Sequence, residues 1–133
     1  MTKQQHTILI IDDSEDEILL TQRVLSRISP EIRSESVLSG EEGLAWLRNS
    51  PKLPVLTLLD MKMIGISGIE TLRSIRADER LKHLSVAIVT NSDLQADYDA
   101  AMAAGADVVL HKSFDLEQFA GEVRKEIEKR AGS

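Results

Sequence analysis

The sequence predicts an α/β fold, in which a doubly wound, five-stranded parallel sheet carries helices on both faces. One observation is that short apolar segments alternate along the chain with segments of helical character. Strict alternation of this kind is typical of parallel strands joined by right-handed helical crossovers. A second observation is that several apolar segments stop abruptly at polar or charged side chains. Because ligands of such sheets bind outside the carboxyl ends of the strands, these side chains are candidates for function.

The expected strands are runs of branched apolar residues. Residues 55–60, Val-Leu-Thr-Leu-Leu-Asp, are predicted to form a central strand, because a nearly continuous apolar run is typical of a strand buried on both faces. Residues 33–38 are more polar, which favours an edge position. The other expected strands are residues 7–11, 86–89 and 108–110.

Capping residues define the first two expected helices. Asp13 or Ser14 can cap a helix whose first turn carries three acids, which complement the positive helix terminus. Pro30 marks the end of that helix. Residues 39–42, Ser-Gly-Glu-Glu, open the second helix, and residues 49–51 close it.

The remaining three helices follow from apolar spacing. Ile69, Leu72 and Ile75 are predicted to face inward on the third helix, and Gly65 and Gly68 are assigned to the loop before it. The neighbouring charged residues are expected to face outward: Arg73, Arg76, Asp78, Glu79 and Arg80. An Ala-rich helix over residues 94–104 is closed by Gly105. The last helix carries apolar residues at helical spacing: Leu116, Phe119, Ala120, Val123 and Ile127.

Length and composition limit the classes of function. The 133 residues are expected to form a single domain covering residues 1–133, and about five residues after the last helix leave no room for an output domain. The chain has no cysteine, which excludes thiolate metal sites and a Cys nucleophile. The net charge of -6 argues against binding nucleic acid. No apolar run approaches the ~18 residues that cross a bilayer, so a cytoplasmic protein with a protein partner and no membrane contact is expected.

The strand ends bring together one set of chemical groups. Three carboxylates, those of Asp12, Asp13 and Asp60, repel one another unless a cation lies among them. Hard oxygen ligands without Cys or clustered His favour Mg²⁺ over zinc. Lys112 adds a positive charge and Thr90 a hydroxyl. A metal, an ammonium and a hydroxyl beside a carboxylate suit stabilisation of a phosphoryl group in transfer.

These residues resemble the response-regulator receiver domain of two-component, histidine-to-aspartate phosphorelay systems, over essentially the whole chain. The matching motifs, in order, are Ile-Ile-Asp-Asp-Ser at residues 10–14, Leu-Asp-Met-Lys-Met at residues 59–63 with Gly68 beyond, Val-Thr at residues 89–90, and Gly-Ala-Asp at residues 105–107 leading to Lys112. The resemblance implies a flavodoxin-like sheet with strand order 2-1-3-4-5. It also implies a stand-alone receiver.

Functional roles also follow from the resemblance. It makes Asp60 the nucleophile that takes a phosphoryl group from a phosphohistidine of a sensor histidine kinase. Asp13, Asp60 and the backbone carbonyl of Lys62 would hold Mg²⁺ directly, with Asp12 acting largely through water. Lys112 would pair with one phosphoryl oxygen, and Thr90 would swing inward to another. The protein would not be an enzyme in the ordinary sense, because it would catalyse only its own phosphorylation and dephosphorylation.

Departures from the family pattern keep two alternatives open. Ser113 replaces the usual Pro after the conserved Lys, so a cis Lys112–Ser113 peptide, costly at a non-Pro residue, is not assumed. Val109 replaces the usual aromatic gate, and Ile64 replaces a Pro and is expected to leave its loop freer. Ser113 and Val109 make a pseudo-receiver adaptor that never turns over phosphate plausible. The site residues that are kept weigh against it: Asp12, Asp13, Asp60, Thr90 and Lys112. A small Mg²⁺-dependent aspartyl phosphatase is the other alternative, although Lys62 stands where such enzymes carry an acid-base Asp.

The downstream partner is not identified by the sequence. The fourth helix, fifth strand and fifth helix are the expected output surface. The outward residues of the last helix carry both signs of charge, which suits a self-complementary homodimer contact. They are Glu122, Arg124, Lys125, Glu126, Glu128, Lys129 and Arg130.

Overall fold

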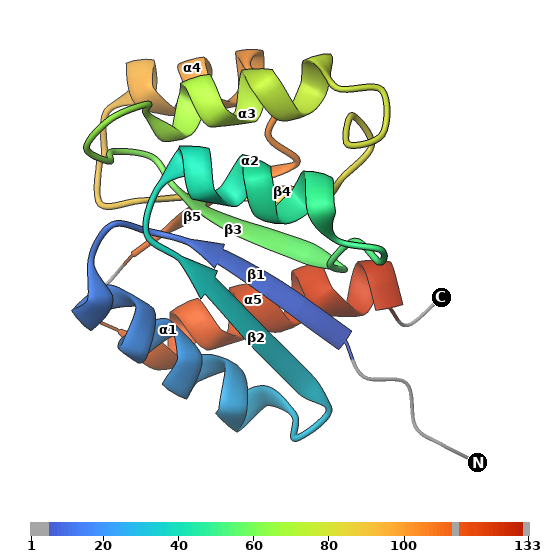
Figure 1. Cartoon of the computed structure of the whole chain (residues 1–133). Coiled ribbons are helices and arrows are strands. Elements are labelled where there is room, and N and C mark those ends of the chain that lie inside the picture. Colours follow the sequence, from blue (N-terminus) through green and yellow to red (C-terminus); the bar gives the residue numbers. More distant parts are fainter. Residues whose placement is uncertain (1–5, 113–114, 132–133) are drawn as a thin grey trace.

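The computed structural model describes residues 6–112 and 115–131, and it contains a five-stranded parallel sheet (Figure 1). The strand order is β2-β1-β3-β4-β5, which confirms the predicted fold class and order. The strands are β1 (His6–Ile11), β2 (Ile32–Val37), β3 (Leu56–Asp60), β4 (Val86–Thr90) and β5 (Val108–His111). Strand β3 lies in the middle of the sheet, as its apolar run predicted, and the more polar β2 lies at an edge.

Helices cover both faces of the sheet. They are α1 (Glu15–Ile28), α2 (Gly40–Asn49), α3 (Gly68–Ala77), α4 (Gln95–Ala103) and α5 (Leu116–Ala131). Figure 1 shows α1 and α5 on one face and α2, α3 and α4 on the other. Every strand is therefore sandwiched between helices, and the predicted doubly wound arrangement is confirmed.

Each strand supplies side chains to two separate hydrophobic cores. In β1, Leu9 and Ile11 pack beneath α2 and α3, whereas Ile8 and Ile10 pack against α1 and α5. All four are almost completely buried. Since successive side chains of a strand point to opposite faces, a sheet with both faces covered requires apolar residues at every position. This requirement explains why β1, β3 and β4 are nearly continuous apolar runs in the sequence, whereas the edge strand β2 is more polar.

Serine side chains cap three of the five helices. Ser14, Ser39 and Ser67 each accept a hydrogen bond from the backbone N–H three residues later. At α3 the contact is reciprocal, because Glu70 also accepts the backbone N–H of Ser67 and completes a capping box. The caps fix where α1 and α3 begin relative to the strands before them.

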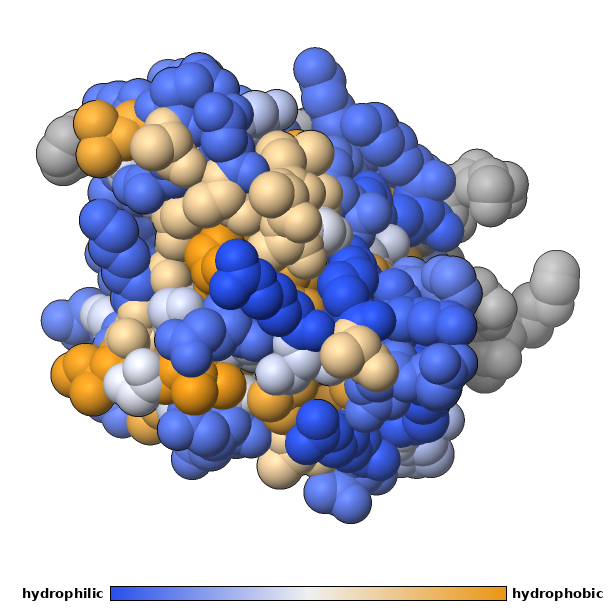
Figure 2. Space-filling view, turned by 90° about the horizontal axis from the view of Figure 1, so that it is seen from above, coloured by the Kyte–Doolittle hydropathy of each residue, from blue (hydrophilic) through white to orange (hydrophobic). Residues whose placement is uncertain are grey.

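Helix α4 is the exception among the helices. It has no side-chain cap and, within its described residues, buries one side chain, Ala101. Leu94, Tyr98 and Met102 lie at intervals of four residues and are exposed. Figure 2, which looks onto the side of the molecule formed by α3 and α4, shows a band of weakly hydrophobic residues between polar ones. The side of α4 that faces away from the sheet is therefore partly apolar.

Two charged residues expected at the surface have internal partners instead. Arg76 on α3 donates to the carbonyl oxygen of Gly105 at 2.9 Å and to that of Leu84 at 2.6 Å, so its guanidinium joins two loops. Glu126 on α5 is buried, and its carboxylate lies 3.1 Å from the guanidinium of Arg130. Helical periodicity placed both residues on the outer face because it contains no information about side-chain partners. Arg76 has partners outside its helix, and Glu126 has an arginine one turn away in the same helix.

No helix in the described part of the chain, residues 6–112 and 115–131, is long and apolar enough to cross a membrane. The conformation of the Lys112–Ser113 peptide bond lies outside the described residues.

Gly68 is the first residue of α3, not part of the loop as the sequence suggested. Its N–H donates to the carbonyl of Met61 at 2.9 Å, which attaches the start of the helix to the segment after β3. A Cβ atom at this position would collide with the backbone carbonyl of Asp60. The glycine therefore lets the helix pack directly against the carboxyl end of the central strand.

We predict that Gly68→Ala lowers the free energy of unfolding by about 1–3 kcal/mol, the usual result of overpacking. Gly121 on α5 is the matched control, because a Cβ there has no heavy atom within 4 Å. Gly121→Ala is expected to raise stability by about 0.5–1 kcal/mol, since alanine favours helix. Urea denaturation of both variants measures the difference, and equal stability of Gly68→Ala and wild type would contradict the close packing.

Candidate functional site

The carboxyl ends of four strands form one edge of the sheet, where the predicted site residues meet. Ile11 pairs with Leu59 in the parallel register of β1 and β3, so Asp12 and Asp60 follow at the same level. The N–H of Asp12 donates to the carbonyl of Val37 at 3.2 Å, and that of Lys112 donates to the carbonyl of Thr90 at 2.8 Å. Backbone hydrogen bonds therefore hold these residues to the sheet just beyond the strand ends.

The three predicted carboxylates form a cluster. Asp12, Asp13 and Asp60 each place an oxygen within 4.8 Å of the others. Asp12 is buried, whereas Asp13 and Asp60 are partly exposed to a cavity of about 500 Å³. The cavity is also lined by Lys62, Thr90 and Lys112, among other residues. Every residue predicted for the site from the sequence therefore lies around one opening.

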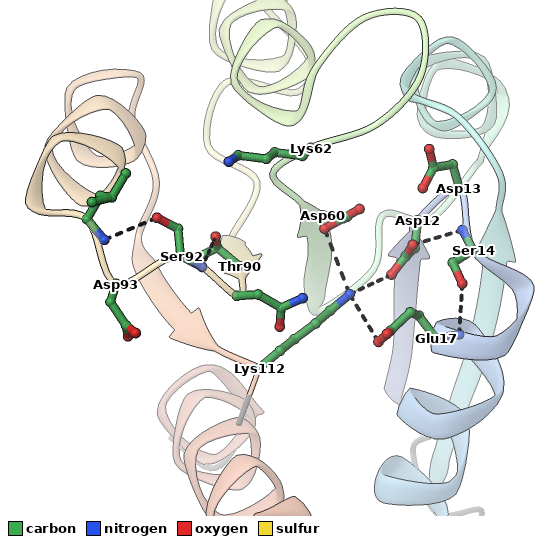
Figure 3. A pocket seen from close by; sticks show the side chains of 12 residues that line it. Asp12, Asp13, Ser14, Glu17, Asp60, Lys62, Thr90, Ser92, Asp93 and Lys112 are labelled. Atoms are coloured by element: carbon green, nitrogen blue, oxygen red, sulfur yellow. Dashed lines mark hydrogen bonds and ion pairs between the residues drawn. The ribbon is translucent and has the colours of Figure 1, made fainter. Parts of the chain in front are cut away.

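The Lys112 side chain lies across the cavity toward the acids (Figure 3). Its Nζ atom is 3.0 Å from Oδ2 of Asp12 and 3.8 Å from Oδ1 of Asp60. The side chain is only 15% exposed, so water screens these contacts weakly. One ammonium therefore partly balances the charge of the acidic cluster.

Burial and neighbouring charges raise the pKa of Asp60 to about 6. Loss of hydration is the largest cause, and the charges of Asp12, Asp13 and Glu17 act in the same direction, while the Lys112 ammonium opposes them. At Lys112, burial alone favours the neutral amine, but the charge of Asp60 and the hydrogen bond to Asp12 outweigh it. The pKa of Lys112 is therefore raised above its usual value.

Asp13 is tied to the loop that follows β3. Its Oδ2 atom accepts the backbone N–H of Ile64 at 2.9 Å. The sequence suggested that Ile64 leaves this loop freer than a proline would. The backbone of the loop is nevertheless attached to Asp13 by this hydrogen bond, which proline could not make because it has no N–H. The Ile64 side chain, 85% exposed, does make the loop more apolar.

Thr90 and Lys62 line the other side of the cavity. The buried Thr90 hydroxyl oxygen accepts the N–H of Ser92 at 3.0 Å, which fixes the first turn of the loop after β4. The Lys62 side chain points away from the acids (Figure 3), and its Nζ atom lies 3.9 Å from a carboxylate oxygen of Asp97 on α4. Val109, at the expected position of an aromatic gate, packs against the core on the α2 and α3 face.

Sequence reasoning missed a fourth acid in the site. Glu17, treated there only as a first-turn acid of α1, places Oε2 at 3.3 Å from Nζ of Lys112. The available signal was its position three residues after the capping Ser14, in the first turn of a helix that starts beside the carboxyl end of β1. The sequence does not show where the Lys112 side chain lies, so Glu17 could not be distinguished from an ordinary acid in the first turn of a helix.

The donor set fits a hard divalent cation. Carboxylate oxygens with an adjacent open cavity are the ligands that Mg²⁺ prefers. Asp60 lies close to two carboxylates that could share a cation with it and to the Lys112 ammonium. A carboxylate in such surroundings can attack a phosphorus centre while positive charge stabilises the phosphoryl oxygens.

Comparison with known proteins identifies a family. The model of the response regulator receiver domain matches residues 8–124. The chain is 29% identical over 127 residues to the chemotaxis protein CheY of Pseudomonas aeruginosa, covering 94% of this chain and 98% of that protein.

Solved structures share the fold. The phosphorylated cyanobacterial phytochrome response regulator RcpA aligns with a TM-score of 0.84 at 24% identity, covering 97% of this chain and 96% of that one. The receiver domain of a Pseudomonas aeruginosa sensor histidine kinase, with magnesium in its active-site cleft, aligns with a TM-score of 0.82 at 21% identity over 97% and 99%. At this level of identity the alignments establish a common fold.

We predict that Asp60→Asn stabilises the metal-free protein at pH 7. A pKa of about 6 in the folded state exceeds the unfolded value of about 3.9, so the folded protein binds more protons between these values. The contribution of this carboxyl to stability therefore falls as pH rises from 4 to 6. The free energy of unfolding of the variant should exceed that of wild type by on the order of 2 kcal/mol at pH 7 and by almost nothing at pH 4. Denaturation in EDTA at both pH values, with the exposed Asp16→Asn as charge control, measures this, and a pH-independent difference would contradict it.

Proposed function

Since this chain belongs to the response regulator receiver domain family, we propose that it is a phosphoacceptor signalling protein in which Asp60 receives a phosphoryl group from a histidine kinase. The observation that carries the proposal is the position of Asp60. It ends the central strand, lies within 4.8 Å of two other carboxylates, and faces the Lys112 ammonium at 3.8 Å.

The transfer forms an acyl phosphate. A carboxylate oxygen of Asp60 attacks the phosphorus of a phosphohistidine, and the bond between phosphorus and the imidazole nitrogen breaks. The bonding electron pair stays on the nitrogen of the kinase histidine. Water later attacks the phosphorus, the bond to the Asp60 oxygen breaks, and inorganic phosphate leaves. The protein is thereby returned to its starting state.

Asp13, Asp60 and the backbone carbonyl of Lys62 would hold Mg²⁺, with Asp12 acting through water. The close carboxylates support this assignment, because their mutual repulsion falls when a cation lies among them. When bound, Mg²⁺ neutralises negative charge shared by the carboxylates and the phosphoryl oxygens. Asp12 is engaged through both oxygens, with the Ser14 N–H and with Lys112, which suits the water-mediated role.

Lys112 and Thr90 would orient the phosphoryl group. Lys112 has to move only a short way from Asp12 to donate to a phosphoryl oxygen, since its Nζ already lies among the carboxylates. The Thr90 hydroxyl would donate to another oxygen after release from Ser92. Movement of the loop after β4 would then pass the signal to α4.

The two rival functions are less well supported. A phosphatase of the aspartyl class needs an acid-base two residues after the nucleophile, and here Lys62 is directed toward Asp97 with 76% of its side chain exposed. A pseudo-receiver would not need the acids and Lys112 around one cavity, and in this chain they are all present there.

We predict that acetyl phosphate with Mg²⁺ adds one phosphoryl group to the wild-type protein and none to Asp60→Asn. Asp13→Asn, or excess EDTA, should slow the reaction at least about tenfold, the loss typical when even an outer-shell partner of a metal is removed. Intact mass spectrometry over time measures the adduct. Asp99→Asn on α4, outside the cavity, is the matched control and should react like wild type. An adduct retained in Asp60→Asn would exclude Asp60 as the phosphoacceptor.

The surface of α4, β5 and α5 would carry the signal to a second copy of the chain or to a downstream protein. Leu94, Tyr98 and Met102 give α4 an exposed apolar stripe that supports such a contact. The outward charges on α5 also remain of both signs, although the buried Glu126 is no longer among them and Arg130 folds back onto it.

We predict a homodimer on this surface whose association weakens severalfold at high salt, because ions screen exposed charges over about 10 Å at 0.1 M. Sedimentation at low and high ionic strength, with and without phosphodonor, measures it. Lys125→Glu on α5 should weaken the dimer, whereas Arg33→Glu on the distant edge strand β2 should not. A monomer under all four conditions would rule the dimer out.

A further inference from the structure

Glu17 is connected to the site by a closed ring of contacts (Figure 3). The N–H of Ser14 donates to Oδ1 of Asp12 at 3.0 Å, and the Ser14 hydroxyl accepts the N–H of Glu17 at 3.3 Å. The Glu17 carboxylate lies 3.3 Å from Nζ of Lys112, which in turn donates to Oδ2 of Asp12 at 3.0 Å. The helix cap thereby fixes the Glu17 backbone at a position from which its carboxylate contacts the ammonium.

The ring divides the Lys112 ammonium unequally between its partners. Its Nζ atom is closer to Asp12 and Glu17, at 3.0 and 3.3 Å, than to Asp60 at 3.8 Å. Both nearer acids belong to the β1 and α1 side of the cavity. In the unphosphorylated protein the ammonium therefore lies nearer to the acids on the α1 side than to the carboxylate that would be phosphorylated, which it still faces at 3.8 Å.

From this geometry we infer that Glu17 is a positioning residue that holds Lys112 on the α1 side and competes with the phosphoryl group for its ammonium. The inference rests on the proposed function, because it concerns the group that Asp60 would carry. Glu17 contacts neither Asp60 nor a reacting atom, and it acts through Lys112.

The competition has a direction. As the ammonium moves toward a phosphoryl group on Asp60, its contact with Glu17 weakens, and the 40% exposure of the Glu17 side chain allows that carboxylate to turn into solvent. Removing or shortening the Glu17 side chain should leave Lys112 more available. The site should then bind a phosphoryl-like anion more tightly and accept a phosphoryl group faster.

The test uses the full-length protein with Mg²⁺ and fluoroberyllate, an anion that mimics a phosphoryl group on a carboxylate. Its dissociation constant is measured by calorimetry for wild type, Glu17→Gln, Glu17→Asp and Glu15→Gln. We expect Glu17→Gln to tighten binding by roughly twofold to fivefold, the range expected for one partly exposed ion pair. The initial rate of phosphorylation by acetyl phosphate should rise in parallel.

The other two variants separate positioning from charge. Glu17→Asp keeps the charge but shortens the side chain by about one methylene, which moves the carboxylate away from Lys112. It should therefore show most of the increase in fluoroberyllate affinity expected for Glu17→Gln. Glu15→Gln removes the same charge from an exposed position on the same helical turn and should behave like wild type.

The outcomes are distinguishable. A gain in Glu17→Gln that is absent from Glu17→Asp, or shared by Glu15→Gln, would mean a general charge effect and would overturn the inference. No gain in any variant would overturn it as well, while leaving the proposed function intact if wild type binds fluoroberyllate and is phosphorylated. Failure of wild type to do either would overturn the proposed function, and the role of Glu17 with it.

Discussion

The contact between one ammonium and a group of carboxylates is the interaction on which the rest of the site depends. Acids gathered at one edge of a sheet repel one another, and the folded protein tolerates them because Lys112 contacts Asp12 and Asp60 from the carboxyl end of β5, at the same edge. Burial, assisted by the charges of the neighbouring acids, outweighs the opposing effect of Lys112 and raises the pKa of Asp60. An acidic cavity balanced by a single ammonium has a donor set that fits a further cation.

The fold supplies the rigidity that this arrangement needs. Strands β1, β3, β4 and β5 run parallel between two hydrophobic cores, so their carboxyl ends are fixed relative to one another. Helices start close to these ends. Gly68 allows α3 to pack against the Asp60 backbone, and Ser14 anchors α1 to Asp12. The loops that carry the acids are therefore held at both sides, whereas α4 has no side-chain cap and buries one side chain among its described residues.

The parallel sheet accounts for the buried part of the site but not for two of its more exposed contacts. The Ile64 N–H binds Asp13, and the Glu17 carboxylate approaches Lys112. Neither Ile64 nor Glu17 lies at the end of an apolar strand, and neither contact corresponds to a sequence motif. These contacts restrict the positions of Asp13 and Lys112 beyond what the sheet does. The cavity therefore has two contacts more than the three acids and the lysine alone would form.

The sequence by itself determined the alternation of strands and helices, the buried central strand ending at Asp60, and the acids, hydroxyl and lysine at the strand ends. These features follow from local patterns, because burial on both faces demands continuous apolar runs and ligands bind where parallel strands stop. Only the tertiary structure decided the contact of Glu17 with Lys112, the internal partners of Arg76 and Glu126, and the attachment of Ile64 to Asp13. Most of these contacts join residues far apart in the sequence, and all depend on side-chain direction, which periodicity within one helix or loop does not encode.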